Sequence, residues 1–154
     1  MQGTAQSIRE IFKKLQEDEN LRAELAKVVA TIFDIFQEDW FRWEVMGWVL
    51  ALYLGWSADD IGRHPELGWV AKAMCAAALM QSDDRKERLL GRALLYHTEL
   101  PPRELFVAHG GELIPAIVYH YQLSARTPHI MQETIKVFNE VKKRLKEEGG
   151  EGGA

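Results

Sequence analysis

Twelve consecutive residues without a charged side chain, residues 45–56, limit the folds that this chain can adopt. Glu44 precedes the stretch, and Asp59 is the next charged residue after it. A membrane-spanning helix needs about 20 apolar residues, so the stretch is too short to cross a bilayer. A helix that is apolar on nearly every side belongs in the centre of a fold or in an interface. The sequence therefore predicts a buried helix over residues 40–54.

A second apolar helix follows after a short polar one. Residues 67–80 contain a single charge, Lys72, and several alanines that allow a neighbouring backbone to come close. Between the two helices, Gly55 is suited to end the first one in a left-handed conformation. Ser57 then begins a capping box that has Asp60 at its third helical position. We expect the two apolar helices to form the central pair of the fold.

The rest of the chain also has helical patterns. Apolar stripes and cap signals predict helices over residues 5–17, 21–37, 82–96 and 112–123, a short helix before Gly110, and a last helix that starts at Pro128. Residues 112–123 would also suit a strand, but Pro115 is tolerated in the first turn of a helix. The sequence predicts an all-α fold, a single-domain compact bundle of about seven to eight helices. We expect it to cover residues 1–148, with a disordered glycine-rich tail at 149–154.

The composition is that of a globular protein with its own hydrophobic core. Of the 154 residues, 47% are apolar, and the formal net charge is -4, which excludes a disordered chain. The one cysteine, Cys75, lies in an apolar run, as expected of a core residue in a reducing compartment. The N-terminus has no signal-peptide pattern. We expect a cytoplasmic protein with no membrane partner, and the low counts of Asn and Cys are typical of a thermophilic source.

No motif for catalysis, cofactor binding or metal binding occurs. The five histidines include no pair at i, i+4 spacing and no Glu-x-x-His, and one cysteine cannot complete a zinc finger. Two Asp-Asp pairs, at 59–60 and 83–84, each follow a serine at a helix start, where capping explains them. A nucleophile elbow, a P-loop and a G-x-G-x-x-G turn are absent. We expect no cofactor and no metal, and enzymatic activity is disfavoured.

Residues 50–63 resemble the helix-turn-helix family at three positions. In that pattern an alanine packs between two helices, a glycine makes the turn, and a branched residue buries the second helix. Ala51, Gly55 and Ile61 occupy these positions. The resemblance implies DNA binding through the second helix. Here, however, that helix would present two aspartates to the phosphates and be cut short by a proline, which favours an ordinary corner between helices.

Basic side chains line up on the helix after Ser82. Arg85, Arg88 and Arg92 lie at i, i+3 and i+7 and form one stripe. Such a stripe can bind phosphates, which makes a nucleic-acid-associated regulator or assembly subunit one alternative function. Acidic residues one turn away favour a solvated face instead. The overall charge adds no support, because residues 61–154 carry 13 basic and 12 acidic side chains.

All five tryptophans fall within a thirty-residue window, and they give the main indication of a binding role. On the helix predicted over residues 40–54 they point to more than one face, so one core face cannot bury all of them. Tryptophan is enriched in protein interfaces. The leading hypothesis is a non-enzymatic helical interaction or regulatory protein that self-associates, or binds a protein partner, through these residues: Trp40, Trp43, Trp48, Trp56 and Trp69.

Two further interpretations of the aromatic residues stay open. A small-molecule binder could have an aromatic pocket that includes Trp43, Trp48 and Tyr53. The rings could instead be buried in a large hydrophobic core that the terminal helices cover, since 154 residues can bury several large side chains.

Overall fold

The computed structural model describes residues 3–38, 43–96, 107–112, 115–119 and 128–153. Every regular element in these ranges is a helix, which confirms the predicted all-α fold. Residues 115–119 are helical and begin at Pro115, as predicted. The labelled helices are α1 (Gly3–Glu17), α2 (Glu19–Glu38), α3 (Trp43–Tyr53), α4 (Ala58–Arg63), α5 (Leu67–Met80), α6 (Arg85–Tyr96) and α9 (Pro128–Gly153).

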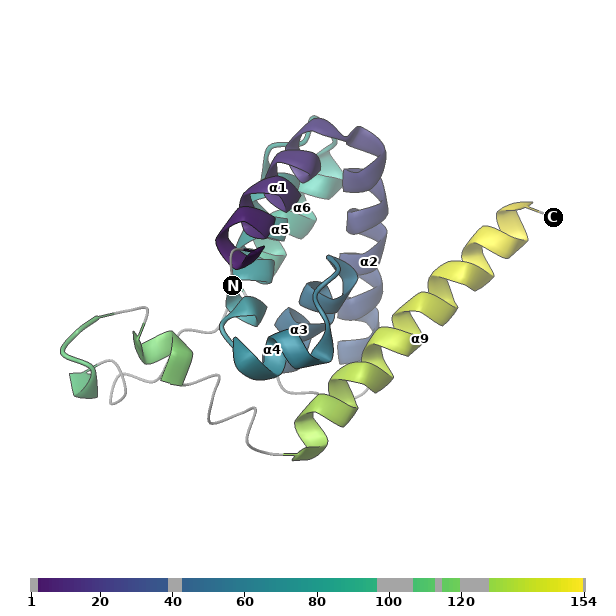
Figure 1. Cartoon of the computed structure of the whole chain (residues 1–154). Helices are drawn as coiled ribbons and strands as arrows, with labels where there is room; N and C mark the ends of the chain where they lie inside the picture. Colours follow the sequence, from purple (N-terminus) through teal and green to yellow (C-terminus); the bar gives the residue numbers. More distant parts are fainter. Residues whose placement is uncertain (1–2, 39–42, 97–106, 113–114, 120–127, 154) are drawn as a thin grey trace.

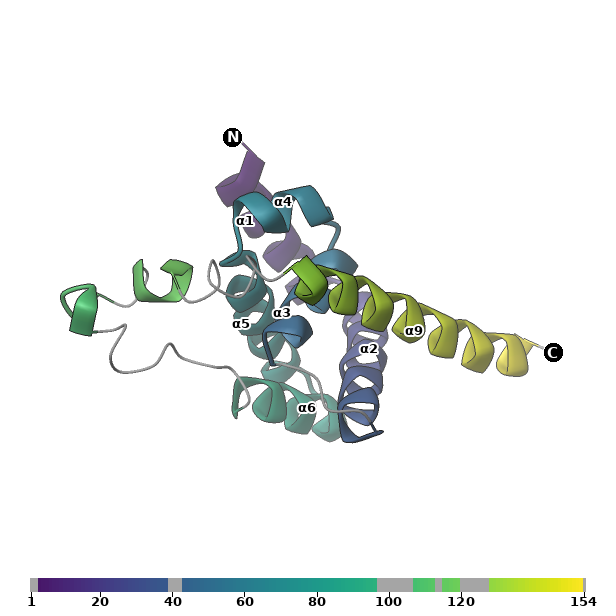
Figure 2. The ribbon, with the colours of Figure 1, turned by 90° about the horizontal axis from the view of Figure 1, so that it is seen from below.

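The helices form a bundle around α3 and α5. In Figure 1, α1 and α2 run in opposite directions from the turn that joins them, and α1 packs against α5, which in turn packs against α6. Seen from below in Figure 2, α9 crosses α2 and α3, and its C-terminal half extends beyond the bundle. None of the helices in the described ranges combines the length and the apolar character needed to cross a membrane.

The last helix extends further than its sequence indicates. α9 continues through Gly153, so residues 149–153 are helical where we expected a disordered tail. The expectation relied on the four glycines of this segment. Each glycine weakens a helix by only about 1 kcal/mol relative to alanine, and the turns before them are rich in lysine and glutamate, which favour helix.

The two apolar helices are central, as predicted, because each is surrounded by other parts of the same chain. α5 packs against α3 on one side and α6 on another, while α9 covers α3. Gly47 and Gly68 allow α3 and α5 to approach closely: a Cβ atom on Gly47 would lie 2.5 Å from the Gly68 carbonyl oxygen. Even Lys72, the one charged residue of α5, is fully buried.

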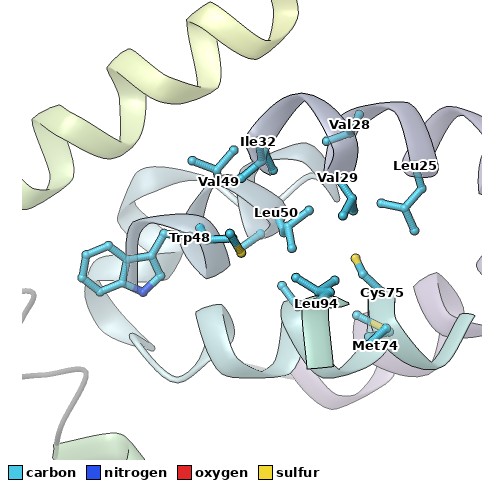
Figure 3. Packing of buried hydrophobic residues seen from close by; sticks show 14 of the residues in the cluster. Leu25, Val28, Val29, Ile32, Trp48, Val49, Leu50, Met74, Cys75 and Leu94 are labelled. Atoms are coloured by element: carbon cyan, nitrogen blue, oxygen red, sulfur yellow. The ribbon is translucent and has the colours of Figure 1, made fainter. Parts of the chain in front are cut away.

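The core lies where α2, α3, α5 and α6 meet. Figure 3 shows Val29 of α2, Leu50 of α3 and Leu94 of α6 in one cluster with the sulfur atom of Cys75. Cys75 is fully buried, and burial raises the pKa of its thiol to about 12. The thiol is therefore protonated at neutral pH and behaves as a small apolar side chain, which agrees with the core position predicted for it.

Candidate interaction surface

Three of the five tryptophans have described side chains, and all three pack into the core of the chain. Trp48 is fully buried, as Figure 3 shows, and its Nε1 donates a hydrogen bond to the Pro65 carbonyl oxygen at 3.1 Å. Trp56 is 7% exposed, and Trp69 is half-buried against the core. The predicted interface role is wrong for Trp48 and Trp56, because a covered side chain leaves no surface for a partner.

The remaining aromatic predictions have different outcomes. Trp40 and the side chain of Trp43 lie outside the described residues, and an interface role for Trp69 stays a prediction. The predicted pocket of Trp43, Trp48 and Tyr53 needs correction, since the Trp48 ring is enclosed in the core. Tyr53 does line a cavity, but the other lining residues are Leu54 and residues of α1 and α2, with no tryptophan among them.

The start of α6 is fixed by hydrogen bonds from the residues that the sequence identifies as caps. Ser82 Oγ accepts a hydrogen bond from the Asp84 backbone N–H at 3.1 Å and donates one to Glu87 Oε1 at 3.0 Å. Arg88 Nη1 donates to the carbonyl oxygens of Ser82 at 3.0 Å and Asp83 at 2.7 Å. The middle arginine of the predicted basic stripe therefore holds the α5–α6 turn in place.

The side of α6 that faces away from α5 is open to solvent. We define the α6 outer face by five exposed residues: Arg85, Lys86, Leu89, Arg92 and Tyr96. Tyr96 is 85% exposed and Leu89 is 51% exposed, which is unusual for large apolar side chains. At 3.6 residues per turn, the four residues other than Lys86 lie within about 60° of one another around the helix. Two apolar side chains thus alternate with two arginines along this side of the helix.

Leu89 belongs to the apolar residues of α6, with Leu90, Ala93 and Leu94, and their spacing predicts that it faces inward, but its side chain is exposed. α6 lies close to α5 at Gly91, where a Cβ atom would lie 2.9 Å from the Ala76 carbonyl oxygen. Leu94 is buried on the side of α6 that contacts α5, whereas Leu89 lies on the exposed side. Lys86, Leu89 and Leu90 line a shallow open concavity of about 340 Å³ on the exposed side. A regular apolar spacing does not reveal this orientation of α6, because a glycine and not a large residue lies at this close contact.

The corner that resembles a helix-turn-helix is a compact structural turn. Gly55 has a φ of +111°, as expected for the residue that ends α3, and Ile61 is buried. α4 has six residues, and its one arginine, Arg63, lies 3.6 Å from the Asp60 carboxylate. A helix this short, with its basic residue paired, does not provide the recognition helix of that family. The residues thus form the ordinary corner that we favoured.

The predicted capping box at Ser57 is confirmed. The Ser57 backbone N–H donates to Asp60 Oδ2 at 3.0 Å, and the Asp60 backbone N–H donates to Ser57 Oγ at 3.1 Å. The hydrogen bond from the Ser57 backbone, together with the contact to its side chain, lowers the pKa of the Asp60 carboxyl below its usual value of 3.8. The ionised carboxylate therefore stabilises the folded state.

This lowered pKa predicts how the stability depends on pH. Because the folded-state pKa of Asp60 lies below the unfolded one, its contribution is complete above the unfolded value and is lost as the pH falls through the folded value. Urea unfolding of the natural chain and of Asp60→Asn, from about pH 6 to about pH 2.5, measures it. The natural chain is expected to be more stable at the upper end, with the difference shrinking toward the lower. A difference that stayed constant would contradict this.

The described residues offer no grouped metal ligands. No cluster of three or more His, Cys, Asp or Glu side chains within them could hold a metal ion. Of the histidines, His64 lies 3.4 Å from the Glu66 carboxylate, and the His109 ring lies 5.1 Å from that of Tyr119. His97, His120 and the side chain of His129 lie outside the described residues.

Comparisons with known proteins identify no relative of this chain. No family model matches it, and neither a curated protein nor a solved structure is significantly similar to it. The case for a function therefore depends on the surface of the molecule, where the α6 outer face combines exposed apolar and basic side chains.

Proposed function

We propose that this chain is a non-enzymatic interaction protein that binds an acidic, amphipathic helix of a partner protein through the α6 outer face. The observation that carries the proposal is the exposure of Leu89 and Tyr96 on the same side of α6 as Arg85 and Arg92. Large exposed apolar side chains that lie together commonly mark an interaction site. An amphipathic helix places apolar anchors at matching intervals and can carry acidic residues beside them.

The charge of this face favours a different protein over a second copy. If two copies paired through α6 about a two-fold axis, the arginines of one would lie near those of the other, and like charges oppose association. The self-association predicted from the sequence also loses its main support, since the apolar helices α3 and α5 are enclosed within the chain. An acidic partner satisfies both the apolar and the basic part of the face.

A designed peptide tests the proposal directly. The probe is a fluorescently labelled helix with leucines at i, i+3, i+4 and i+7 and glutamates beside them, and the reference probe has lysines in place of the glutamates. Fluorescence anisotropy at low salt measures the affinity of both. We expect the glutamate peptide to bind, and Leu89→Glu and Arg92→Glu each to weaken it at least about tenfold, as at an interface hot spot.

Two matched variants serve as controls. Ile135→Glu and Lys136→Glu make the same types of change at exposed positions of α9, away from α6, and should leave the affinity unchanged. The proposal would be contradicted if the lysine peptide bound as tightly as the glutamate peptide. It would also be contradicted if the α9 variants lost as much affinity as the α6 variants. Light scattering of the free protein adds a separate check: a dimer that Leu89→Glu dissociates would assign the face to a second copy.

Nucleic-acid binding is the second candidate, and the same face favours it. Two exposed arginines can contact phosphates, and the exposed Tyr96 ring can stack on a base. The engagement of Arg88 with the α5–α6 turn removes the middle of the stripe from such a site. Titration with DNA and RNA at several salt concentrations separates the two candidates, because phosphate binding weakens steeply with salt. A cytoplasmic location and a thermophilic source stay predictions from the sequence.

A further inference from the structure

The connection between α1 and α2 is a single residue, Asp18, and it interrupts the helical hydrogen bonding only briefly. The Asp18 backbone N–H donates to the Lys14 carbonyl oxygen at 3.0 Å, and the Arg22 backbone N–H donates to the Asp18 carbonyl oxygen at 3.1 Å. Both bonds join residues four positions apart, as in an α-helix. One helix over residues 3–38 would therefore need only three further backbone hydrogen bonds, those donated by residues 19–21.

Two side chains at this bend satisfy backbone groups that the three missing bonds would use. Asp18 Oδ1 accepts a hydrogen bond from the Leu21 backbone N–H at 3.1 Å and so caps α2. Arg22 Nη1 donates to the Leu15 carbonyl oxygen at 3.2 Å and also to the Gln16 carbonyl oxygen. In a continuous helix these two oxygens would accept from the backbone N–H groups four residues later. Asp18 and Arg22 thus stabilise the bend.

The sequence around the bend is compatible with a continuous helix. Residues 4–38 contain no glycine and no proline, the two residue types that weaken a helix most. The bent form also leaves a donor unsatisfied, because Arg22 Nε is buried and forms no hydrogen bond within the described residues. A cavity of about 390 Å³ lies beside the bend, between the start of α2 and the α5–α6 turn. The bend therefore depends on its two capping side chains and not on a residue that forbids helix.

Straightening within a single chain would remove α1 from the bundle at a cost. Leu15 is fully buried, and Ile8, Ile11 and Phe12 are partly buried against the core. These side chains and the parts of α2 and α5 beneath them would be exposed to water. Exposure of apolar surface costs free energy in proportion to its area. A second copy that straightens in the same way carries an identical α1, which can cover the exposed surface.

We infer that this chain exchanges α1 with a second copy of itself. The bend straightens, residues 3–38 form one helix, and the α1 of each copy packs against α2 and α5 of the other. A two-fold dimer of this kind recovers the apolar contacts of α1, gains backbone hydrogen bonds in both chains and releases Arg22. Exchange of an identical element is a low-cost route to a dimer. The inference goes beyond the proposed function, because it uses no residue of the α6 outer face.

A variant without the two capping side chains tests the inference. Asp18→Ala combined with Arg22→Ala removes both caps, and alanine favours helix at each position. The protein is refolded from urea at high concentration and analysed by size exclusion with light scattering. We expect the dimer of this variant to have a dissociation constant at least about tenfold below that of the natural chain, because two bends straighten in each dimer. Lys27→Ala combined with Asp34→Ala is the control at exposed positions of α2 and should match the natural chain.

Glu19→Pro should have the opposite effect. Glu19 is the first residue of α2, where proline is favoured and where the bent form has no backbone hydrogen bond from the N–H group. In a continuous helix a proline at this position would lie in the interior and would clash with the Leu15 carbonyl group. The variant is therefore expected to stay monomeric under the same conditions and to be at least as stable as the natural chain. A Glu19→Pro dimer as tight as that of the double alanine variant would overturn the inference.

Hydrogen exchange followed by NMR shows whether the bend straightens in the dimer. The backbone N–H groups of Glu19 and Asn20 form no hydrogen bond within the described residues of the bent form, so they should exchange quickly in the monomer. In a continuous helix both groups are bonded, and their exchange should slow at least about tenfold. Leu89→Glu should leave this dimer intact. A double alanine variant that stays monomeric, a dimer with fast exchange at these two groups, or a dimer that Leu89→Glu dissociates would each refute the exchange of α1.

Discussion

Replacement of Gly47 by alanine is expected to destabilise the fold by about 2 kcal/mol or more. The added Cβ would lie 2.5 Å from the carbonyl oxygen and 2.8 Å from the carbonyl carbon of Gly68. Both atoms belong to the backbone of α5, so no side chain can rotate away, and the two central helices must separate. The loss outweighs the roughly 1 kcal/mol that alanine gains in helix propensity.

Thermal unfolding followed by far-UV circular dichroism measures this effect, with an expected fall in Tm of roughly 5–10 °C for a chain of this size. Gly62→Ala is the matched control, because Gly62 lies in α4 and a Cβ atom there would have no neighbour within 4 Å. That substitution should stabilise the protein by about 0.5 to 1 kcal/mol. Equal effects of the two substitutions would show that α3 and α5 are not in close contact.

Trp48→Ala is expected to cost about 3 to 5 kcal/mol, since it removes a fully buried indole and leaves a cavity among large neighbours. Trp48→Phe keeps an aromatic ring but removes the hydrogen bond from Nε1 to the Pro65 carbonyl oxygen. We expect an intermediate loss of about 2 kcal/mol from this second variant. Urea unfolding monitored by circular dichroism gives both values.

Trp69 provides the comparison for Trp48. Its Nε1 is buried and forms no hydrogen bond within the described residues, so phenylalanine there removes an unsatisfied donor together with part of the ring. The two effects oppose each other, and Trp69→Phe should change the stability by less than about 1 kcal/mol. If Trp69→Phe proved as costly as Trp48→Phe, the hydrogen bond to Pro65 would not explain the difference between the tryptophans.

Helix identities and caps could be predicted because they depend on local chemistry. The capping box of Ser57, the positive φ of Gly55 and the hydrogen bonds that Ser82 and Asp84 accept at the start of α6 each follow from residue types within one turn. The central pair was also predictable, since helices that lack a polar face have to be enclosed. The close approach was expected from the alanines of α5, whereas a pair of glycines, Gly47 and Gly68, makes it.

The candidate sites were harder to predict because they depend on how helices rotate against one another. The tryptophans indicated an interface only under the assumption that each helix buries one face, and α3 buries its other sides as well. Leu89 faces outward because the seam between α5 and α6 centres on Gly91, which no apolar stripe marks. The Tyr53 cavity combines residues of three helices that are up to 43 positions apart, from Ile11 to Leu54, so no local pattern could reveal it.

The rate at which the buried Cys75 thiol is alkylated can be used to follow unfolding. As the only cysteine in the sequence, fully enclosed and with a pKa of about 12, it cannot react with an alkylating reagent while the core is closed. Its rate of modification therefore records how often the interior opens. Each substitution discussed above can be ranked by this one chemical signal in the protein as it is, without an added label.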